Sequence, residues 1–387
     1  MTNKPIPFKL SIADSDIADL KARLASARWP VEVDPGSWQR GVPGAYLRHV
    51  AEHWQGMDWR AMESRLNQYQ QVLFEHDGQT MHAFHVRSPH ETATPLVLIH
   101  GWPSSGIEYL KLIDPLTNPT AHGGIASDAF HLVIPTQPGF GLSPAPARTG
   151  WTSADTAAGI AELMAALGYE RYGVHGTDMG SDVAGKLDVA APGKLIGIHL
   201  GTDTDTIVAV ASFMGGSAAA VPGLSPEQQE RLAALFAAIP DRNGYIAIQS
   251  SRPKTLGYAL NDSPVGQLAW ILEKFEAWTN PAKATVEDAV DLDQLLINVS
   301  AYWFGGGGSA SANAVWESMH AMGWAPPSTT PRGVAAFNAD DLARPLMDPQ
   351  HQIAHWSEFA QGGHFPAMEE PALLADDLRR FFASIPR

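Results

Sequence analysis

Hydrophobic positions change their spacing along the chain, and these changes divide it into regions. In the first part, apolar side chains recur every three to four residues in segments 11–30, 45–53 and 59–69, which predicts three helices. The segment 81–88, MHAFHVRS, alternates between apolar and polar residues and predicts a strand. We therefore expect a distinct N-terminal region at 1–90.

From Pro95 onward, short apolar runs alternate with helical patterns. This alternation is typical of a doubly wound α/β sheet, in which most strands are parallel and buried on both faces. The predicted strands are 95–99, 131–135, 172–175 and 196–200, and the predicted helices are 155–167 and 182–189.

The stretch 206–327 interrupts this alternation, because it consists mostly of helical patterns rich in aromatic residues. Strands return at 332–338 and 353–359, and a helix at 371–382 closes the chain. A helical insertion of this kind is expected to form a cap over the carboxyl ends of the strands, where α/β sheets bind ligands. The core is thus expected in two parts, 91–205 and 328–387.

Composition narrows the possible partners. The formal net charge is −15, which argues against a surface that binds nucleic acid or an anionic membrane. With no cysteine, the chain has no disulfide, thiolate nucleophile or cysteine-ligated metal. Neither a signal-peptide pattern nor an apolar run of membrane-spanning length is present, so we expect a cytoplasmic enzyme, with a homo-oligomer left open.

The clearest chemical motif is GTDMG at 176–180, between a predicted strand and a predicted helix. Small residues two positions on either side of the centre are the frame of the nucleophile elbow of α/β-hydrolases. The central residue here is Asp178 rather than the usual serine. An ionised carboxylate needs no activating base and can attack an sp³ carbon to form an ester.

Two further motifs stand where this fold needs them. The sequence HGWP at 100–103 ends the first core strand, so the backbone N–H groups of Trp102 and Met179 are predicted to form the oxyanion hole. The sequence GGHF at 362–365 precedes the last helix, so His364 is the predicted catalytic base.

The acid that orients His364 is less sharply marked. Asp340 follows the strand at 332–338, in the expected chain order, and is the favoured candidate, with Asp341 beside it. Asp203 or Asp205, after the strand at 196–200, is the rival position.

Other polar residues have simpler explanations. His82 and His85 lie on opposite faces of a strand, so they do not form a metal pair, and no metal site is predicted. His175 lies within a buried strand and is expected to be a core residue. The serines beside the motifs are expected to cap helices: Ser104, Ser105 and Ser181.

The chain resembles the microsomal-type epoxide hydrolases, including juvenile-hormone epoxide hydrolases and bacterial relatives. The resemblance covers nearly the whole length and is carried by segments such as FKLSIADSDIADLKARLASARWP, HGWPSSGIEYLKLIDPLTNP, LGYALNDSPVGQLAWILEKFEAWTN and GGHFPAMEEP. It implies an α/β-hydrolase fold with a helical cap and the family's N-terminal extension at 1–90. It also implies hydrolysis of an apolar epoxide by water without a cofactor, with Asp178 as nucleophile, His364 as base and Asp340 where the family usually has Glu.

The resemblance also implies two departures. Met179 stands where the family commonly has tryptophan after the nucleophile. Two cap tyrosines that protonate the epoxide oxygen in the family are matched here by Trp270 and Trp316, which are expected to line the substrate site. A replacement acid is therefore sought among other tyrosines, namely Tyr258, Tyr302 and, as a weaker third, Tyr245.

Two rival functions remain open at this point. A dehalogenase would share Asp178 and His364, and the indole N–H groups of Trp270 and Trp316 would bind the leaving halide. A catalytically inactive homologue would only bind an apolar ligand under the cap.

Overall fold

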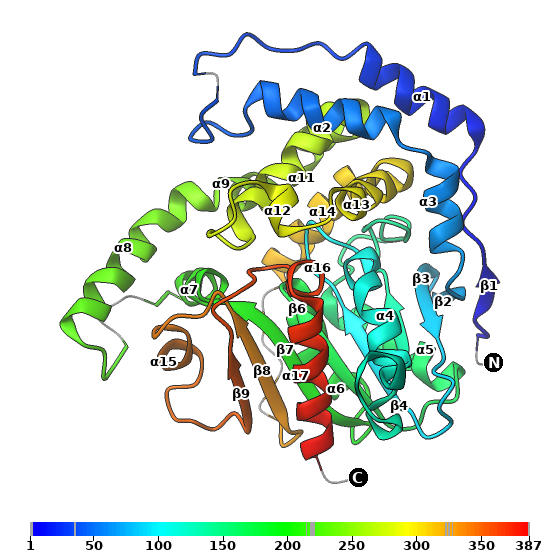
Figure 1. Ribbon diagram of the computed structural model, residues 1–387, viewed down its shortest axis with the longest axis vertical. Coiled ribbons are helices and arrows are strands. Elements are labelled where there is room, and N and C mark those ends of the chain that lie inside the picture. The colour runs from blue at the N-terminus through cyan, green and yellow to red at the C-terminus, as the bar shows by residue number, and fades with distance from the viewer. Residues whose placement is uncertain are drawn as a thin grey trace.

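A nine-stranded sheet organises the computed structural model, which describes residues 3–34, 36–213, 215–216, 221–321, 323, 326 and 328–385. The strand order is β1-β2-β3-β5-β4-β6-β7-β8-β9 (Figure 1). The strands are β1 (Ile6–Phe8), β2 (Gln71–His76), β3 (Gln79–Val86), β4 (Thr94–Ile99), β5 (Phe130–Pro135), β6 (Tyr172–Thr177), β7 (Leu195–Asp203), β8 (Arg332–Phe337) and β9 (His355–Glu358).

Strands β4 to β9 form the parallel part of the sheet, as the alternating pattern predicted. Strands β1, β2 and β3 extend it as an antiparallel edge. Asp77 and Gly78 both adopt positive φ in the turn between β2 and β3, a pairing that suits the two-residue turns of β-hairpins. The N-terminal part of the chain therefore contributes strands to the core sheet, and β1 and β2 were not predicted.

Strand β4 shows how the sheet is buried on both faces. Leu96 and Leu98 pack into one hydrophobic cluster, while Val97 and Ile99 pack into the other, and all four are inaccessible to solvent. Continuous apolar runs are the expected sequence of a strand covered on both sides.

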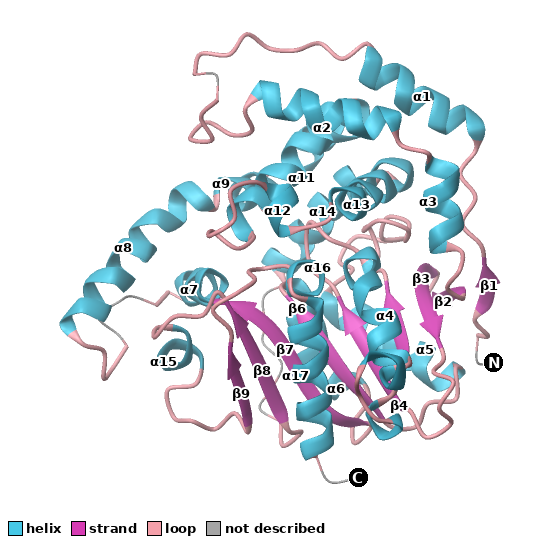
Figure 2. Cartoon of the chain, viewed as in Figure 1, coloured by secondary structure: helices cyan, strands magenta, loops and turns pink. Residues whose placement is uncertain are grey.

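Helices cover both faces of the sheet and continue above it (Figure 2). The α-helices are α1 (Asp14–Ala25), α2 (Gly44–Gly56), α3 (Trp59–Leu66), α4 (Leu110–Thr117), α5 (Ser153–Ala166), α6 (Met179–Ala190), α7 (Thr204–Phe213), α8 (Pro226–Arg242), α9 (Gly244–Gln249), α10 (Pro253–Asp262), α11 (Pro264–Trp278), α12 (Val286–Ala289), α13 (Leu292–Gly305), α14 (Gly307–His320), α15 (Ala343–Met347), α16 (Pro366–Glu369) and α17 (Pro371–Ser384). Short 3₁₀ helices are η1 (Gly106–Tyr109), η2 (Pro119–His122) and η3 (Ala126–Asp128).

Within the predicted cap region, α9 to α14 lie above the end of the sheet where β6 and β7 finish (Figure 1). Helices α1 and α2 cross over the cap and pack against α11. The Trp54 indole of α2 donates a hydrogen bond to the Ser300 hydroxyl of α13 at 2.7 Å, so the N-terminal region is tied to the cap. The predicted last residue of the cap, 327, lies outside the described residues.

No helix among the residues that the structure describes is both long enough and apolar enough to cross a bilayer.

Candidate active site

Asp178 occupies the sharp turn between β6 and α6. Its φ of 49° and ψ of −127° are strained for an L-residue, and such strain is typical of functional turns. A Cβ on Gly180 would lie 2.1 Å from the Ile99 carbonyl oxygen, and one on Gly176 would lie 2.4 Å from the Gly180 carbonyl oxygen. Gly180 therefore lets the turn approach β4 closely, and Gly176 lets the turn close on itself, as the motif predicted.

The Asp178 carboxylate is held by the loop after β4. Its Oδ1 accepts a hydrogen bond from the Trp102 backbone N–H at 2.9 Å. Gly101 lies so close that a Cβ there would meet Asp178 Oδ1 at 2.2 Å. Met179 is the first residue of α6, so its N–H has no acceptor within the helix, and no bond from it to Asp178 occurs in the described chain.

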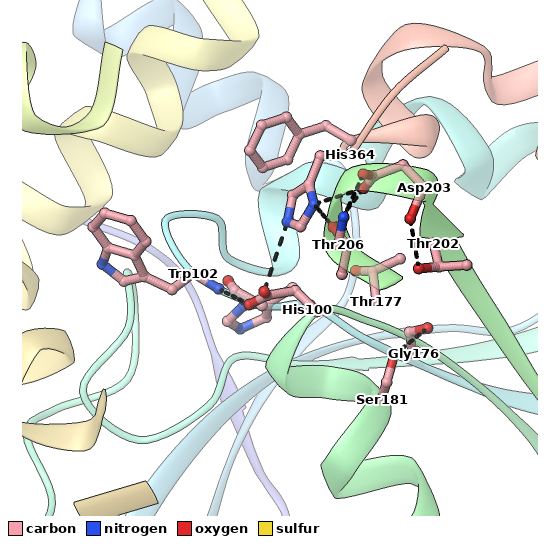
Figure 3. Close-up of polar contacts among 12 residues, drawn as sticks. His100, Trp102, Gly176, Thr177, Ser181, Thr202, Asp203, Thr206 and His364 are labelled. Atoms are coloured by element: carbon pink, nitrogen blue, oxygen red, sulfur yellow. Dashed lines mark hydrogen bonds and ion pairs between the residues drawn. The ribbon is translucent and has the colours of Figure 1, made fainter. Parts of the chain in front are cut away.

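His364 lies between two carboxylates. Its Nε2 is 3.7 Å from Asp178 Oδ2, and its Nδ1 is 3.0 Å from Asp203 Oδ2. Figure 3 shows the ring between Asp203 on one side and the loop of His100 and Trp102 on the other. The arrangement has the order nucleophile, base and orienting acid that a catalytic triad requires.

The loop that carries His364 is anchored to the cap. The His364 backbone N–H donates to the Trp278 carbonyl oxygen at 2.9 Å. The partly buried Glu369 carboxylate accepts from the Phe365 N–H at 3.0 Å and from the Asn280 N–H at 2.8 Å. The position of the imidazole therefore depends on the end of α11 as well as on the sheet.

The structure does not support Asp340 as the orienting acid, because the hydrogen bond to the His364 ring comes from the rival Asp203. Asp340 accepts hydrogen bonds from the Thr204 hydroxyl at 3.2 Å and the Leu342 N–H at 2.9 Å, and it pairs with Arg231. Asp203 ends β7, the neighbour of β6, whereas Asp340 follows β8, one strand further away.

Asp203 is buried and held from two further directions. It accepts hydrogen bonds from the Thr206 N–H at 2.8 Å and from the Thr206 hydroxyl at 2.6 Å. Asp205, the other rival, pairs with Arg242 at 2.7 Å instead.

Burial and neighbouring charges shift the pKa values of three groups at the site. Burial alone would lower the pKa of His364, but the hydrogen bond and charge of Asp203 and the charges of Asp178 and Glu108 outweigh it and raise that pKa to about 9. Burial opposes ionisation of Asp203, yet His364 and Thr206 hold the pKa of Asp203 below its usual value. Burial raises the pKa of Glu108, which accepts a long hydrogen bond from the Thr177 hydroxyl at 3.5 Å, to about 7.

The cap side of the site is aromatic. The Tyr245 ring of α9 stacks on the Trp102 ring, with centroids 5.0 Å apart and planes 8° apart. Trp278 of α11 packs edge-on against Tyr245 at 5.2 Å and lies 4.9 Å from the His364 ring. Trp278 was not singled out from the sequence, because one tryptophan among 12 carries no local signal of its place.

Of the three candidate tyrosines, only the weakest candidate has a suitable position. Tyr258 is 80% exposed on α10, so the expectation for it is wrong. The Tyr302 hydroxyl is buried and donates to the Ser104 carbonyl oxygen at 2.7 Å. The Tyr245 hydroxyl makes no hydrogen bond within the described part of the chain, and burial and the Asp178 charge raise its pKa.

The structure gives no support to Trp270 and Trp316 as site residues. The Trp270 indole N–H points to the Gln249 amide oxygen at 3.4 Å. The Trp316 ring stacks on His320 at 4.0 Å, at the end of α14. In the described residues, the indole rings that contact the catalytic loops are those of Trp102 and Trp278.

The remaining polar residues serve the fold. His82 is buried and both ring nitrogens have partners, Thr136 and Gln71. Ser105 caps η1 by accepting from the Ile107 N–H at 3.3 Å, whereas Ser181 donates to the Gly176 carbonyl oxygen.

One group of side chains among the described residues has metal-ligand spacing, and the sequence did not reveal it. His199, His355 and Asp377 place ligand atoms within 4.8 Å of one another. Asp377 accepts hydrogen bonds from His199 at 2.9 Å, from His355 at 3.0 Å, and from Ser357 and Arg380. Asp377 Oδ1 accepts three of these bonds and Oδ2 accepts one, so the group joins β7, β9 and α17 as a hydrogen-bonded hub.

Comparison with known proteins decides the family. A model described as the epoxide hydrolase N terminus matches residues 5–109, and one described as the alpha/beta hydrolase fold matches residues 94–187. A protein of Stigmatella aurantiaca (strain DW4/3-1) named "Putative epoxide hydrolase" is 40% identical over 98% of this chain and 85% of its own length. The chain belongs to the epoxide hydrolase family.

Other members of the epoxide hydrolase family agree over most of the chain. Epoxide hydrolase 1 of Sus scrofa is 32% identical over 97% of this chain and 88% of its own length. The crystal structure of juvenile hormone epoxide hydrolase from Bombyx mori matches with a TM-score of 0.79 and 26% identity, covering 98% of this chain and 94% of that one. The predicted family and the predicted α/β-hydrolase fold are confirmed, and the chain is an enzyme of this family.

Proposed function

We propose that the protein hydrolyses an apolar epoxide to a vicinal diol through an ester on Asp178. One observation carries this proposal: a carboxylate stands at the nucleophile elbow with Oδ1 already bound by a backbone N–H and Oδ2 facing the histidine. The two oxygens are therefore different before any substrate binds. Oδ2 is the attacking atom, and Oδ1 becomes the carbonyl oxygen of the ester.

In the first step, Asp178 Oδ2 attacks an epoxide carbon, and the carbon–oxygen bond of the ring breaks. The oxygen that leaves carries negative charge in a site with little water, so it needs a proton. Tyr245, whose hydroxyl makes no hydrogen bond within the described residues, is the proposed donor, above the Trp102 ring of the loop that holds Asp178. A hydroxyalkyl ester and a Tyr245 phenolate result.

Ester formation also prepares the base. The negative charge of Asp178 is one cause of the raised pKa of His364, and that charge disappears when the ester forms. The pKa of His364 then falls, so the ring releases its proton to solvent and becomes a neutral imidazole that can accept a proton from water. It regains that proton from solvent once the Asp178 carboxylate has re-formed. Asp203 continues to orient the ring and to stabilise its cationic form.

In the second step, water loses a proton to His364 and attacks the ester carbonyl carbon. The tetrahedral oxyanion forms on Oδ1, where the Trp102 N–H already donates and the Met179 N–H is the second proposed donor. Collapse breaks the bond to the diol oxygen, which takes the proton from His364. The second water proton, released from the re-formed Asp178 carboxyl, restores Tyr245.

The walls of the site favour an apolar substrate, with aryl epoxides as the best starting probes. Trp102, Tyr245, Trp278 and Phe365 supply aromatic faces around the catalytic groups. The dehalogenase alternative depended on the indole N–H groups of Trp270 and Trp316. The Trp270 N–H donates to Gln249 instead, and the Trp316 ring stacks on His320. The complete set of Asp178, Asp203 and His364 argues against an inactive binding protein.

A single turnover in ¹⁸O-labelled water tests the mechanism. Excess enzyme is mixed with styrene oxide, and the diol and the peptide that contains Asp178 are analysed by mass spectrometry. The covalent route gives an unlabelled diol and one ¹⁸O in Asp178. A diol that carries solvent oxygen from the first turnover shows direct attack by water and rejects the proposal. Absence of diol, with halide released from a haloalkane panel, would establish the dehalogenase.

A further inference from the structure

A buried ammonium group lies against the proposed proton donor. Lys274 of α11 is only 4% exposed, and its Nζ lies 4.6 Å from the centroid of the Tyr245 ring and 5.8 Å from that of Trp278. Its ion-pair partner is Glu273, whose Oε1 is 2.9 Å from Nζ and whose side chain remains 36% exposed. The lysine therefore directs its charge at aromatic faces of the site, while the compensating carboxylate lies toward solvent.

This position matters for the charge that Tyr245 acquires. A cation over an aromatic face is attracted by the ring, and the attraction increases when the phenol becomes a phenolate. Burial and the nearby Asp178 carboxylate both oppose phenolate formation, because they raise the pKa of Tyr245. The Lys274 charge acts in the opposite direction, and it does so in a place where water screens little.

We propose that Lys274 is a positioning residue that stabilises the Tyr245 phenolate and so speeds opening of the epoxide. This inference rests on the proposed function, because it needs Tyr245 as the proton donor. Lys274 touches no reacting atom and acts only through the Tyr245 ring. Its influence on rate is expected in the first step, because Tyr245 gives up its proton there and is reprotonated only after His364-activated water has cleaved the ester.

The test is a pair of substitutions measured in both half-reactions. Lys274→Met keeps the length and apolar contacts of the stem but removes the charge, and Lys274→Arg keeps the charge. Both are made in the wild-type chain and in Tyr245→Phe. Stopped-flow tryptophan fluorescence with excess enzyme and styrene oxide gives the alkylation rate, and decay of the isolated ester adduct gives the hydrolysis rate.

We expect Lys274→Met to slow alkylation about tenfold and to leave ester hydrolysis within twofold of wild type, with Lys274→Arg restoring most of the rate. In the Tyr245→Phe chain, Lys274→Met should slow alkylation by less than twofold, because the group through which it acts is gone. A merely structural lysine would slow both half-reactions, or would cost the same factor with and without the Tyr245 hydroxyl, and either result overturns the inference.

The outcomes separate this inference from the proposed function. If Tyr245→Phe alkylates at the wild-type rate, the proposed proton donor is wrong, and the role of Lys274 fails with it. If Tyr245→Phe is slow but Lys274→Met alkylates normally, only the role of Lys274 is wrong. If Lys274→Met does not fold, two other variants replace it. Lys274→Gln should slow alkylation, and Glu273→Gln, at a more exposed position, should not. Any other pair of results rejects the inference.

Discussion

The two sides of the active site are held by different kinds of interaction. On the sheet side, Asp178, Asp203 and His364 stand at strand ends or on an anchored loop, and backbone N–H groups and charged hydrogen bonds hold them. On the cap side, Tyr245 and Trp278 are positioned by ring contacts. Bond-making groups must be held within fractions of an ångström, which strand ends provide, whereas ring packing tolerates change. The sheet side therefore defines the reaction, and the cap side defines which substrate enters and how readily its epoxide ring opens.

The largest effect is expected at the nucleophile. Asp178→Asn keeps the shape of the side chain but removes the attacking charge, so turnover should fall by about 10⁴-fold or more. Steady-state diol formation measures this, and intact-protein mass spectrometry should show no adduct. If the Asp178→Asn enzyme is active while mass spectrometry shows that the introduced amide is still intact, Asp178 is not the nucleophile.

Next in size is the loss of the orienting acid. Asp203→Asn should slow ester hydrolysis by about 10³-fold, because the His364 ring loses its orientation and its cation loses a charge partner. The ester adduct should then accumulate and be visible by mass. Asp340→Asn is the matched control and should remain within a few-fold of wild type. If the two variants exchange behaviour, the acid is Asp340 after all.

A smaller effect is expected on the cap side. Tyr245→Phe should slow alkylation by about 10²-fold while ester hydrolysis continues, because only the first step uses the proton of Tyr245. Tyr258→Phe, on the exposed face of α10, is the control and should alkylate normally. Equal slowing of both half-reactions would mean that Tyr245 only shapes the site.

The smallest expected effect is on the free energy of unfolding and concerns Glu108, on the sheet side of the site. Because burial raises the pKa of Glu108 to about 7, the folded state becomes less stable as pH rises from the ordinary glutamate pKa toward 7, while the unfolded chain ionises freely. Glu108→Gln removes this cost, so its gain over wild type should grow across that interval to at most about 3 kcal/mol and then level off. Thermal unfolding at pH 4.5, 6 and 8 measures it. A pH-independent difference between the two chains would show that Glu108 is not a buried neutral acid.

Local sequence determined the sheet side almost completely. The motifs at 100–103, 176–180 and 362–365 specify a loop, a turn and a second loop whose geometry depends on glycines and on neighbours a few residues away. Continuous apolar runs likewise specified the parallel strands, because a strand covered on both faces has no polar side. These features could therefore be predicted from the sequence without knowing which residues pack against them.

Only the tertiary structure decided the orienting acid and the cap. Asp203 ends β7 and Asp340 follows β8, and only the tertiary structure shows that the hydrogen bond to His364 comes from Asp203. Tyr245, Trp278 and Lys274 come from two helices with no shared motif, and they meet because α9 and α11 pack over the Trp102 loop. Such contacts join residues far apart in the chain, so their partners are set by packing and cannot be read from local pattern.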